Sequence, residues 1–479
     1  MSKQTRNTCL TAVCIAILTT LPAVVAAQQS PLPDAPSTQL FAALAQVSTS
    51  SRLPIASVPP TSETAPQDTA QPAGPQLTIE QAEQMAIRNN PNISVAHLLA
   101  LAQAQVTREV RSAEMPTAIG ELTAVDAHEN SRITAGLLNN PSVYERAAGG
   151  LSVSQLITDF GRTHNLVLSA ESTAKARLES ERATELDITL TVDQAFYQAL
   201  TAQAMFKVAQ GTVSQRQATS DQVGALAKAK IRSDLDRSFA DVQLSQATLL
   251  LLDAENNEQA AMAALNNVLG SEQDQQYVLV DETNNNPPPA PNDPEALVTA
   301  AFTARPDLAA LNDQFLAARH YSTAERDLWL PTVSAMAAAG ATPVRADQIQ
   351  SSWYGAAGAN ISIPVFNGFL YNAEARNAKL RAQAAQENVR GLRDTIARDV
   401  RTAVLNAQTA YQRIAVTKEL LDQSNFALDL ATARYKIGLS GIVEISEAQL
   451  NQTQAEISNT NARYSYQTAL AVVRYEIGQ

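Results

Sequence analysis

The sequence of 479 residues is internally duplicated, and this limits what it can fold into more than any other feature. Pro91 and Pro116 are 25 residues apart, and so are Pro306 and Pro331, at an offset of 215. Further along, corresponding positions are 208 residues apart, so the seven-residue difference must fall in a loop between the matching blocks. A repeat of this length predicts two copies of one structural unit.

Each half also contains a long stretch without proline, from Ser142 to Asn286 and from Val365 to Gln479. These stretches are rich in residues that favour helices, and their apolar residues advance in steps of three, four or seven, which predicts a coiled-coil seam. In the second half the seam is Leu392, Ile396, Val400, Ala403, Ala407, Ala410, Ile414, Leu421, Leu428 and Tyr435. A single helix over about 162–226 would be roughly 100 Å long, too long for an ordinary globular domain. A matching helix is predicted over about 369–435.

Strands are predicted between the prolines and the long helices. Side chains alternate within 151–156 and again within 359–363, as in a two-faced strand. With weaker, alanine-rich partner strands before them, these segments predict β-hairpins over about 117–159 and 332–366.

Aromatic residues accompany the predicted hairpins. Tyr144, Trp353 and Tyr354 stand at hairpin loops or strand starts, where interfacial aromatics would anchor a membrane barrel. A small soluble sheet explains the alternation equally well, so the pattern alone leaves both open. No segment after the N-terminus is apolar over enough residues to form a membrane helix, so strands would have to make any crossing.

The N-terminus has the features of a secretory signal peptide over residues 1–27. Lys3 and Arg6 precede an apolar run from Leu10 to Val25, and small residues follow. The run has about 16 residues, whereas a membrane helix needs roughly 20. A lipid anchor at Cys14 is not expected, because almost no apolar segment precedes it.

The remaining chain divides into four parts. Residues 28–76 hold nine of the 22 prolines and are expected to be disordered or extended. The first repeat is placed at 77–270 and the second at 293–479. A linker at 271–292, rich in asparagine and proline, joins them.

Composition argues against several classes of function. A net charge of −12 and a pI near 5.0 argue against nucleic-acid binding, which needs an excess of cations. The two cysteines, Cys9 and Cys14, lie in the expected signal peptide, and the four histidines are scattered, so no thiol or metal chemistry is expected. No phosphate-binding GxxxxGK[ST] loop occurs. We therefore expect no catalytic residues, no metal and no cofactor.

Each long helix is predicted to end in a turn that leads into a shorter antiparallel helix. In the second half Gly438 suits a helix C-terminus, and Ser440 is able to cap the helix that follows. In the first half the corresponding turn covers residues 227–233. These turns are the tips of two helical hairpins.

Local motifs in both halves resemble the TolC-type outer-membrane efflux channel family, over about 400 residues from Leu77 to the end. They are ISIPVFNGF at 361–369 with SQLITDFG at 154–161, and RYKIGLSGIVEISEAQL at 434–450 with SDLDRSFADVQLSQA at 233–247. The resemblance implies a mainly α fold with a membrane β-barrel part. It also implies a homotrimer, in which each subunit gives four strands to a twelve-stranded barrel and its helices to a periplasmic tunnel.

The resemblance further implies function and partners. It implies a trimeric exit duct in the outer membrane of a Gram-negative cell, serving a tripartite efflux or type I secretion machine. The partners would be a periplasmic adaptor protein, an inner-membrane pump or transporter and outer-membrane lipid, with no nucleic acid. The adaptor-contacting tip residues would be Ile231, Arg232, Ser233, Gly438, Leu439 and Ser440, although plain helix capping explains them as well.

The resemblance also implies that the tunnel entrance carries an acidic ring and that specific residues hold it closed. Glu444 and Glu447 match the ring and lie three residues apart on one helix face, although an ordinary solvated face remains an alternative. Asp236 and Tyr435 match residues that hold the entrance closed. Ser440 replaces a basic residue often found there, so we expect closure by hydrogen bonds and coil packing more than by an inter-helix salt bridge.

Two other classes of protein are considered. A periplasmic coiled-coil adaptor, or a structural protein without a channel, would share the heptads and the signal peptide but not the duplication. A secreted hydrolase could use Glu444 and Glu447. However, two carboxyls three residues apart on a coiled-coil helix make a poor acid and base pair.

Overall fold

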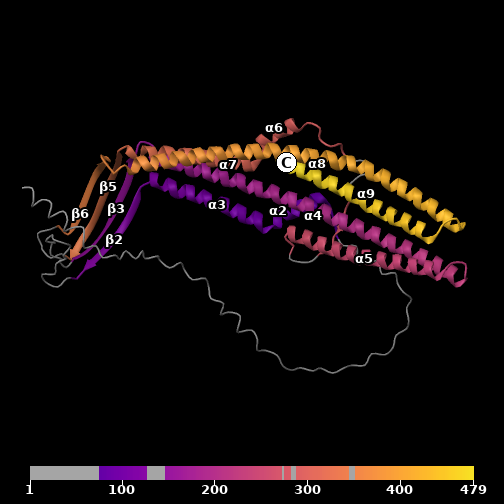
Figure 1. Ribbon diagram of the computed structural model, residues 1–479. Helices are drawn as coiled ribbons and strands as arrows, with labels where there is room; N and C mark the ends of the chain where they lie inside the picture. Colours follow the sequence, from indigo (N-terminus) through magenta and orange to yellow (C-terminus); the bar gives the residue numbers. More distant parts are fainter. Residues whose placement is uncertain (1–74, 127–145, 272–274, 282–286, 345–350) are drawn as a thin grey trace, which may run out of the picture. The chain divides into compact units, whose positions relative to one another are not determined.

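The computed structural model describes most of the chain after the N-terminal region (Figure 1). The expected signal peptide, nearly all of 28–76 and Tyr144 lie outside the described residues. The described residues all belong to one compact unit, Ala70–Gln479. They are 75–126, 146–271, 275–281, 287–344 and 351–479.

The two repeats contain the same elements in the same order (Figure 1). The first consists of α2 (Ile79–Asn89), α3 (Pro91–Arg111), β2 (Thr117–Val125), β3 (Arg146–Thr158), α4 (Arg162–Lys228) and α5 (Asp234–Val268). The second consists of α6 (Pro294–Ala304), α7 (Pro306–Arg326), β5 (Thr332–Val344), β6 (Trp353–Ser362), α8 (Leu370–Lys436) and α9 (Ile442–Glu476). Both long helices, α4 and α8, have 67 residues, and both return helices, α5 and α9, have 35.

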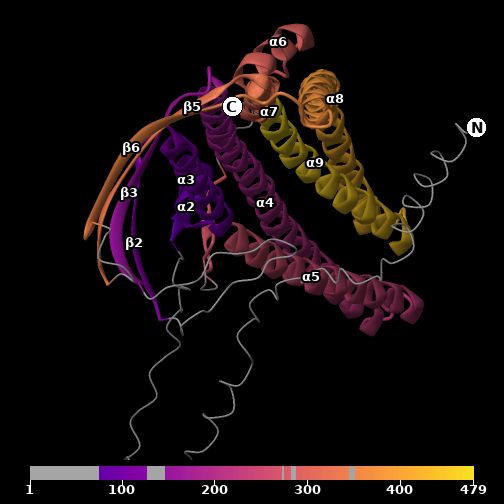
Figure 2. The same cartoon turned by 90° about the vertical axis from the view of Figure 1, so that its left-hand side faces the viewer.

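The four long strands form one antiparallel sheet in the order β2-β3-β5-β6 (Figure 2). Each repeat contributes a hairpin, and β3 pairs with β5 where the two hairpins meet. The described chain is therefore mainly helical, internally duplicated and supplies four strands per subunit, which confirms these parts of the predicted fold class.

The long helices pack through small residues. Along α5, the buried residues Ala240, Ala247, Ala254 and Ala261 recur every seven positions. Helix α4 packs against α5 on one side and α9 on another, while α8 packs against α9. Alanine lets neighbouring backbones approach closely, so small residues allow several helix pairs to pack at once.

A two-stranded pair was missed by the sequence interpretation. Strand β1 (Gln76–Leu77) runs parallel to β4 (Val278–Leu279), so the expected extended segment and the expected linker each contribute a strand. Leu77 and Leu279 are buried in an apolar cluster with α2, α4 and α5. Strands of two residues show no alternation, so only their burial distinguishes them from a loop.

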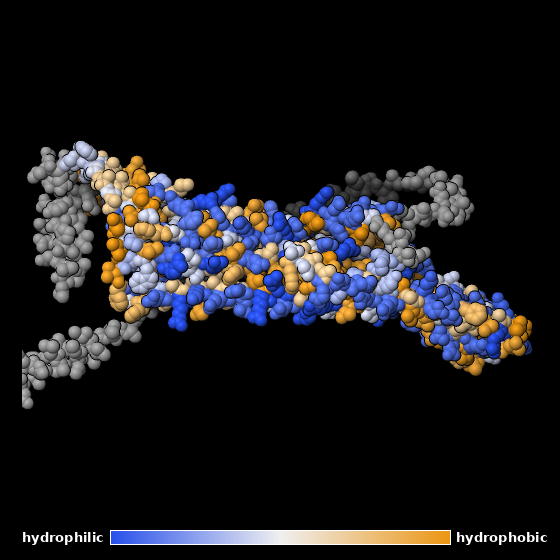
Figure 3. All heavy atoms as spheres, turned by 90° about the horizontal axis from the view of Figure 1, so that it is seen from above, coloured by the Kyte–Doolittle hydropathy of each residue, from blue (hydrophilic) through white to orange (hydrophobic). Residues whose placement is uncertain are grey.

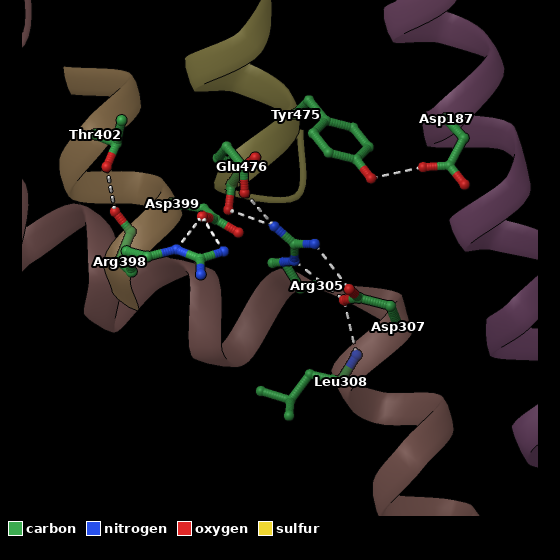
Figure 4. A network of polar contacts seen from close by, with 9 residues as sticks. All are labelled: Asp187, Arg305, Asp307, Leu308, Arg398, Asp399, Thr402, Tyr475 and Glu476. Carbon is green, nitrogen blue, oxygen red and sulfur yellow. Dashed lines mark hydrogen bonds and ion pairs between the residues drawn. The ribbon is translucent and has the colours of Figure 1, made fainter. Parts of the chain in front are cut away.

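The end of each repeat docks onto the proline-containing kink at its start. In the second repeat, Arg305 between α6 and α7 forms ion pairs with Glu476 at the end of α9, at 2.5 Å, and with Asp307 of α7, at 2.7 Å. The hydroxyl of Tyr475, also at the end of α9, donates a hydrogen bond to Asp187 of α4 at 2.6 Å (Figure 4). At the end of α5, the side chain of Asn90 donates to the Val268 carbonyl at 3.0 Å. The two repeats thus dock at equivalent positions, but through different side-chain interactions.

Glycine is required at both docking points. Gly270 and Gly478 have φ values of +69° and +79°, and a Cβ at either would lie within 3 Å of backbone atoms of the facing kink. Both conditions select glycine. None of the described helices combines the length and apolar character needed to cross a membrane.

Candidate functional site at the helical tips

The second tip is a turn that glycine closes. Gly438 has φ +78°, and its N–H donates to the Tyr435 carbonyl at 3.0 Å. The N–H of Leu439 donates to the Arg434 carbonyl at 2.9 Å. This pair of hydrogen bonds is the Schellman motif that ends many helices. Gly438 therefore has the helix-ending role that the sequence suggests.

The first tip has the same backbone but a different residue at the strained position. Lys230, which is 208 residues before Gly438, has φ +57°. Its N–H donates to the Ala227 carbonyl at 2.9 Å, and the N–H of Ile231 donates to that of Leu226 at 2.9 Å. A left-handed conformation is unfavourable for a residue with a Cβ, so the first tip is the more strained of the two.

The two return helices begin differently. Ser233 and Asp236 form a capping box at the start of α5, in which each side chain accepts from the other's backbone N–H, at 3.1 and 3.3 Å. Helix α9 begins at Ile442 with Gly441 at the N-cap position. Ser440 lies one residue too early to cap it, and its buried hydroxyl has no partner among the described residues. The prediction that Ser440 caps α9 was therefore wrong.

Tyr435 joins the two hairpins at their tips. It is 3% exposed and packs with Val223 of α4, Ala240 of α5 and Ile442 of α9. The Arg232 guanidinium lies 4.4 Å above its ring and donates to its carbonyl at 3.4 Å. Burial raises the pKa of the Tyr435 hydroxyl, which Arg232 partly offsets.

Arg232 is the residue whose role sequence reasoning missed. It stacks on Tyr435 across the hairpins, a contact that the sequence interpretation did not include, while its expected contact with an adaptor stays a prediction. Asp236, expected to help hold the closure, uses its carboxylate on the Ser233 cap, and the Tyr435 hydroxyl has no partner among the described residues. The sequence does contain a signal for this contact, because the first tip has a basic residue, Arg232, at the position that corresponds to Ser440 in the second tip.

The predicted acidic pair lies at the start of α9. Glu444 forms an ion pair with Arg434 of α8, with 3.3 Å between Nε and Oε1, and the two side chains are 43% and 49% exposed. Pairs this exposed contribute at most about 1 kcal/mol. Glu447 is exposed. This exposed salt bridge joins the two helices of one hairpin, and the expectation that hydrogen bonds and coil packing contribute more to the closure stays a prediction. Glu447 forms no ion pair within the described part of the chain, so it is the less compensated charge of the two.

A buried polar link lies one level above the tips. Arg216 of α4 is 4% exposed, and its guanidinium donates to the side chain of Gln449 of α9. Gln449 in turn donates to the Thr219 hydroxyl at 3.1 Å. Burial lowers the pKa of Arg216. Together with Arg232 and Tyr435, this link ties the first hairpin to the second.

Figure 3 shows apolar and polar residues mixed over this face of the molecule, and exposed apolar residues occur at the tips beside charged ones such as Lys230 and Lys436. The exposed large apolar residues of the two turns and of the helix starts that follow them are Ile231, Leu235, Ile437, Leu439 and Val443. Scattered apolar residues are normal on a surface, but a group at the end of a hairpin is typical of an interaction site. Within the described ranges, no cluster of three His, Cys, Asp or Glu side chains is placed to share a metal ion.

Comparison with known structures identifies similar folds. The chain superposes on the outer membrane channel CmeC of Campylobacter jejuni with a TM-score of 0.73 and 17% identity, covering 89% of this chain and 94% of that one. For CusC the TM-score is 0.73 with 20% identity, covering 88% and 99%. For the open MtrE channel of Neisseria gonorrhoeae it is 0.70 with 20% identity, covering 84% and 88%.

Sequence comparison extends the similarity. The chain is 25% identical over 121 residues to the outer membrane protein TolC of Salmonella enteritidis, and 25% identical over 109 residues to that of Escherichia coli K12. These alignments cover 25% and 23% of this chain and only 25% and 22% of the relatives. A family model described as outer membrane efflux protein matches residues 83–271 and 297–479, which is most of both repeats. The chain therefore belongs to the outer membrane efflux protein family, whose members lie in the outer membrane of Gram-negative cells.

Proposed function

We propose that this protein is a homotrimeric exit duct in the outer membrane, which docks through its helical tips onto a periplasmic adaptor of a tripartite efflux or type I secretion machine. An inner-membrane pump or transporter supplies the energy. The observation that carries this proposal is that packing found between the two repeats has no counterpart at the outer sides of the subunit.

Helix α7 has two long neighbours, whereas its repeat partner α3 has one. Helix α7 packs against α8 of its own repeat and against α4 of the other. Helix α3 packs against α4, and no comparable α3–α8 packing exists within the described residues. By the duplication, the missing neighbour of α3 is the α8 helix of another copy.

The surfaces left open on α3 and α8 are suited to this contact. The exposed apolar residues of α3 include Val95, Leu98, Leu99 and Leu101, and α8 exposes Leu380. In the existing contact, the Ser169 hydroxyl of α4 donates to the Ala317 carbonyl of α7 at 2.9 Å. The equivalent positions are Asn377 on α8 and Ala102 on α3, and both are exposed in the single chain.

The sheet is incomplete in the same way. Its outer strands are β2 and β6, and each has one edge without a strand partner in the described chain. Unpaired backbone groups cannot face lipid, because each costs several kcal/mol there. Pairing β6 of one copy with β2 of the next satisfies both edges, and three copies give the twelve strands that the family resemblance implies.

The tips provide the docking surface. The exposed residues Ile231 and Leu439 lie on the two turns, so the trimer would present six tips, each with exposed apolar side chains. An adaptor that covers them buries apolar surface at roughly 25 cal/mol per Å². Gly438 closes the second turn, and Ser233 caps the helix that follows the first.

Glu444 and Glu447 would line the entrance of this duct. Three copies of Glu447 would concentrate cations in a narrow passage, and Glu444 would add less because Arg434 offsets its charge. Arg232, stacked on Tyr435, would hold the entrance closed together with the Arg216 link.

Channel recording tests the duct. The purified protein is reconstituted in a planar bilayer, and ion selectivity is measured for the wild type and the Glu444→Lys/Glu447→Lys variant. The proposal predicts a cation-selective channel whose preference falls or reverses in the variant, and no change for Glu387→Lys, an exposed residue on α8 far from the tips. Absence of any channel would contradict the duct, and a channel with unchanged preference would contradict only the entrance ring.

Site-specific crosslinking tests the docking. A photoreactive amino acid at Leu439 should capture a periplasmic adaptor in intact cells, as identified by mass spectrometry. The same probe at Glu419, on the exposed side of α8, serves as the control. Capture of the adaptor from both positions alike, or from neither, would contradict docking through the tips.

A further inference from the structure

One cross-strand row of the sheet combines an acid, two glycines and a tyrosine. Glu121 of β2 pairs with Gly150 of β3, Gly150 pairs with Gly340 of β5, and Gly340 pairs with Tyr354 of β6. Residues that pair directly across strands point to the same face of a sheet. The four positions therefore share one face.

The Tyr354 side chain lies flat across this row. A Cβ at Gly340 would overlap its ring, and a Cβ at Gly150 would overlap its hydroxyl. The side chain therefore extends from β6 over β5 and reaches β3, which is possible only because both positions are glycine. Its hydroxyl ends above Gly150, directly across from Glu121 on the neighbouring strand.

The two faces of the sheet differ in character. The face with Glu121 carries the polar residues Thr117, Ser152, Ser154, Ser334 and Asn360, and with them the apolar residues Ile119, Leu156 and Met336. The opposite face carries Leu122, Leu151, Val153, Trp353 and Ile361 together with many alanines. Its one longer polar side chain, Gln155 near the end of β3, donates to the Glu114 carbonyl at 2.9 Å. In a membrane barrel the apolar face contacts lipid and the polar face contacts water, so Glu121 faces the pore.

Glu121 has no charged partner among the described residues. It is exposed and makes no ion pair or side-chain hydrogen bond within the described part of the chain. The four strands contain one other charged residue, Arg146, whose backbone pairs with Val125 at the far end of β2. A carboxylate beside an aromatic ring attracts cations through its charge and through the ring face.

We propose that Glu121 and Tyr354 form a selectivity collar inside the barrel, which favours cationic solutes such as protonated amines and is separate from the acidic residues at the tips. The collar rests on the proposed trimeric channel, because three copies place three carboxylates around one pore. Glu121 supplies the charge. Tyr354 is a positioning residue, which covers the glycines and places its hydroxyl over Gly150, across from the Glu121 position on the next strand.

Selectivity measurements test the charge. The full chain is reconstituted in planar bilayers, and the K⁺ over Cl⁻ permeability ratio is taken from reversal potentials. Glu121→Gln should lower the ratio at least about twofold in 0.1 M KCl, and less in 1 M KCl, where the screening length falls to about 3 Å. Glu121→Asp should restore most of it, and Tyr354→Phe should give a smaller loss. The same fall should appear in a Glu444→Gln/Glu447→Gln background, since the two sites are independent.

Cysteine accessibility tests the position without relying on charge. With Cys9 and Cys14 changed to Ser, the chain has no other cysteine. Glu121→Cys should react with a positively charged, water-soluble methanethiosulfonate and lose conductance. Leu122→Cys, its neighbour on the lipid-facing side, should not.

The outcomes separate the two proposals. A wild-type protein that forms no channel overturns the proposed function and the collar with it. If the wild type conducts but Glu121→Gln leaves the K⁺ over Cl⁻ permeability ratio unchanged, the collar alone is overturned. The same holds if the methanethiosulfonate reduces the conductance of Leu122→Cys and not that of Glu121→Cys. Oligomer migration in gels and sheet content by circular dichroism, each compared with wild type, identify a variant that has not folded.

Discussion

The fold strongly alters the ionisation of Asp193. It lies on α4, is 4% exposed, and its Oδ1 atom has no partner among the described residues. Burial, and then the neighbouring carboxyl of Glu83 on α2, raise its pKa to about 7, while Arg474 of α9 opposes the shift. A buried carboxylate costs less when it is protonated, so Asp193 makes the attachment of α2 sensitive to pH.

This environment predicts a pH-dependent stability. Because the pKa of Asp193 is higher in the folded than in the unfolded chain, the folded state binds more protons between about pH 4 and pH 7. Its stability should therefore fall as the pH rises through this window. Thermal unfolding by circular dichroism should show a midpoint lower at pH 8 than at pH 5, and Asp193→Asn should reduce the difference. If the unfolding midpoint of Asp193→Asn depends on pH as strongly as that of the wild type, this prediction is wrong. Asp253→Asn, a substitution at an exposed position, is the control and should keep the pH dependence of the wild type.

At this scale the sequence identified the tip residues but not their partners. The motif around Gly438 is local, and its helix-ending role could be recognised from residue type alone. The contact between Arg232 and Tyr435 joins residues about two hundred positions apart, so no local pattern indicates it. The error at Ser440 has a similar cause, since the choice between Ser440 and Gly441 as N-cap depends on where the turn ends.

At the scale of elements, the two tips form a natural comparison of helix ends. Lys230 and Gly438 occupy equivalent left-handed positions, with φ +57° and +78°. Lys230→Gly should stabilise the first tip by about 1 kcal/mol, and Gly438→Lys should destabilise the second by about 1–2 kcal/mol.

Hydrogen exchange of the tip peptides measures these changes locally, where global unfolding would not detect them. Amides of the first turn should exchange more slowly in Lys230→Gly, and those of the second turn faster in Gly438→Lys. Slower exchange of the second turn in Gly438→Lys would contradict the assigned strain.

The elements themselves were largely accessible from sequence, because each long helix and each hairpin repeats a period many times. The 67 residues of α4 contain about nine heptads, so a few unusual positions do not obscure the pattern. Strands β1 and β4 have two residues each and no period, and their pairing depends on the burial of Leu77 against helices far away in sequence. Tertiary packing alone determines such elements.

At the scale of the whole molecule, the duplication explains both what the subunit contains and what it lacks. Two similar units placed side by side make one contact between them and leave the matching surfaces open at the outer ends. Here those surfaces are the exposed sides of α3 and α8 and the edges of β2 and β6. The family match and the structural similarity extend over both repeats.

Engineered disulfide formation tests the central claim, that another copy of the chain completes each subunit. With Cys9 and Cys14 changed to Ser, cysteines are introduced at Ala102 and Asn377, the positions that correspond to the Ala317–Ser169 contact. We predict that oxidation in outer membranes converts the Ala102→Cys/Asn377→Cys variant to a covalent trimer on non-reducing gels. Either single variant should stay uncrosslinked, and reductant should reverse the product. A variant that stays a monomer after oxidation would contradict the account.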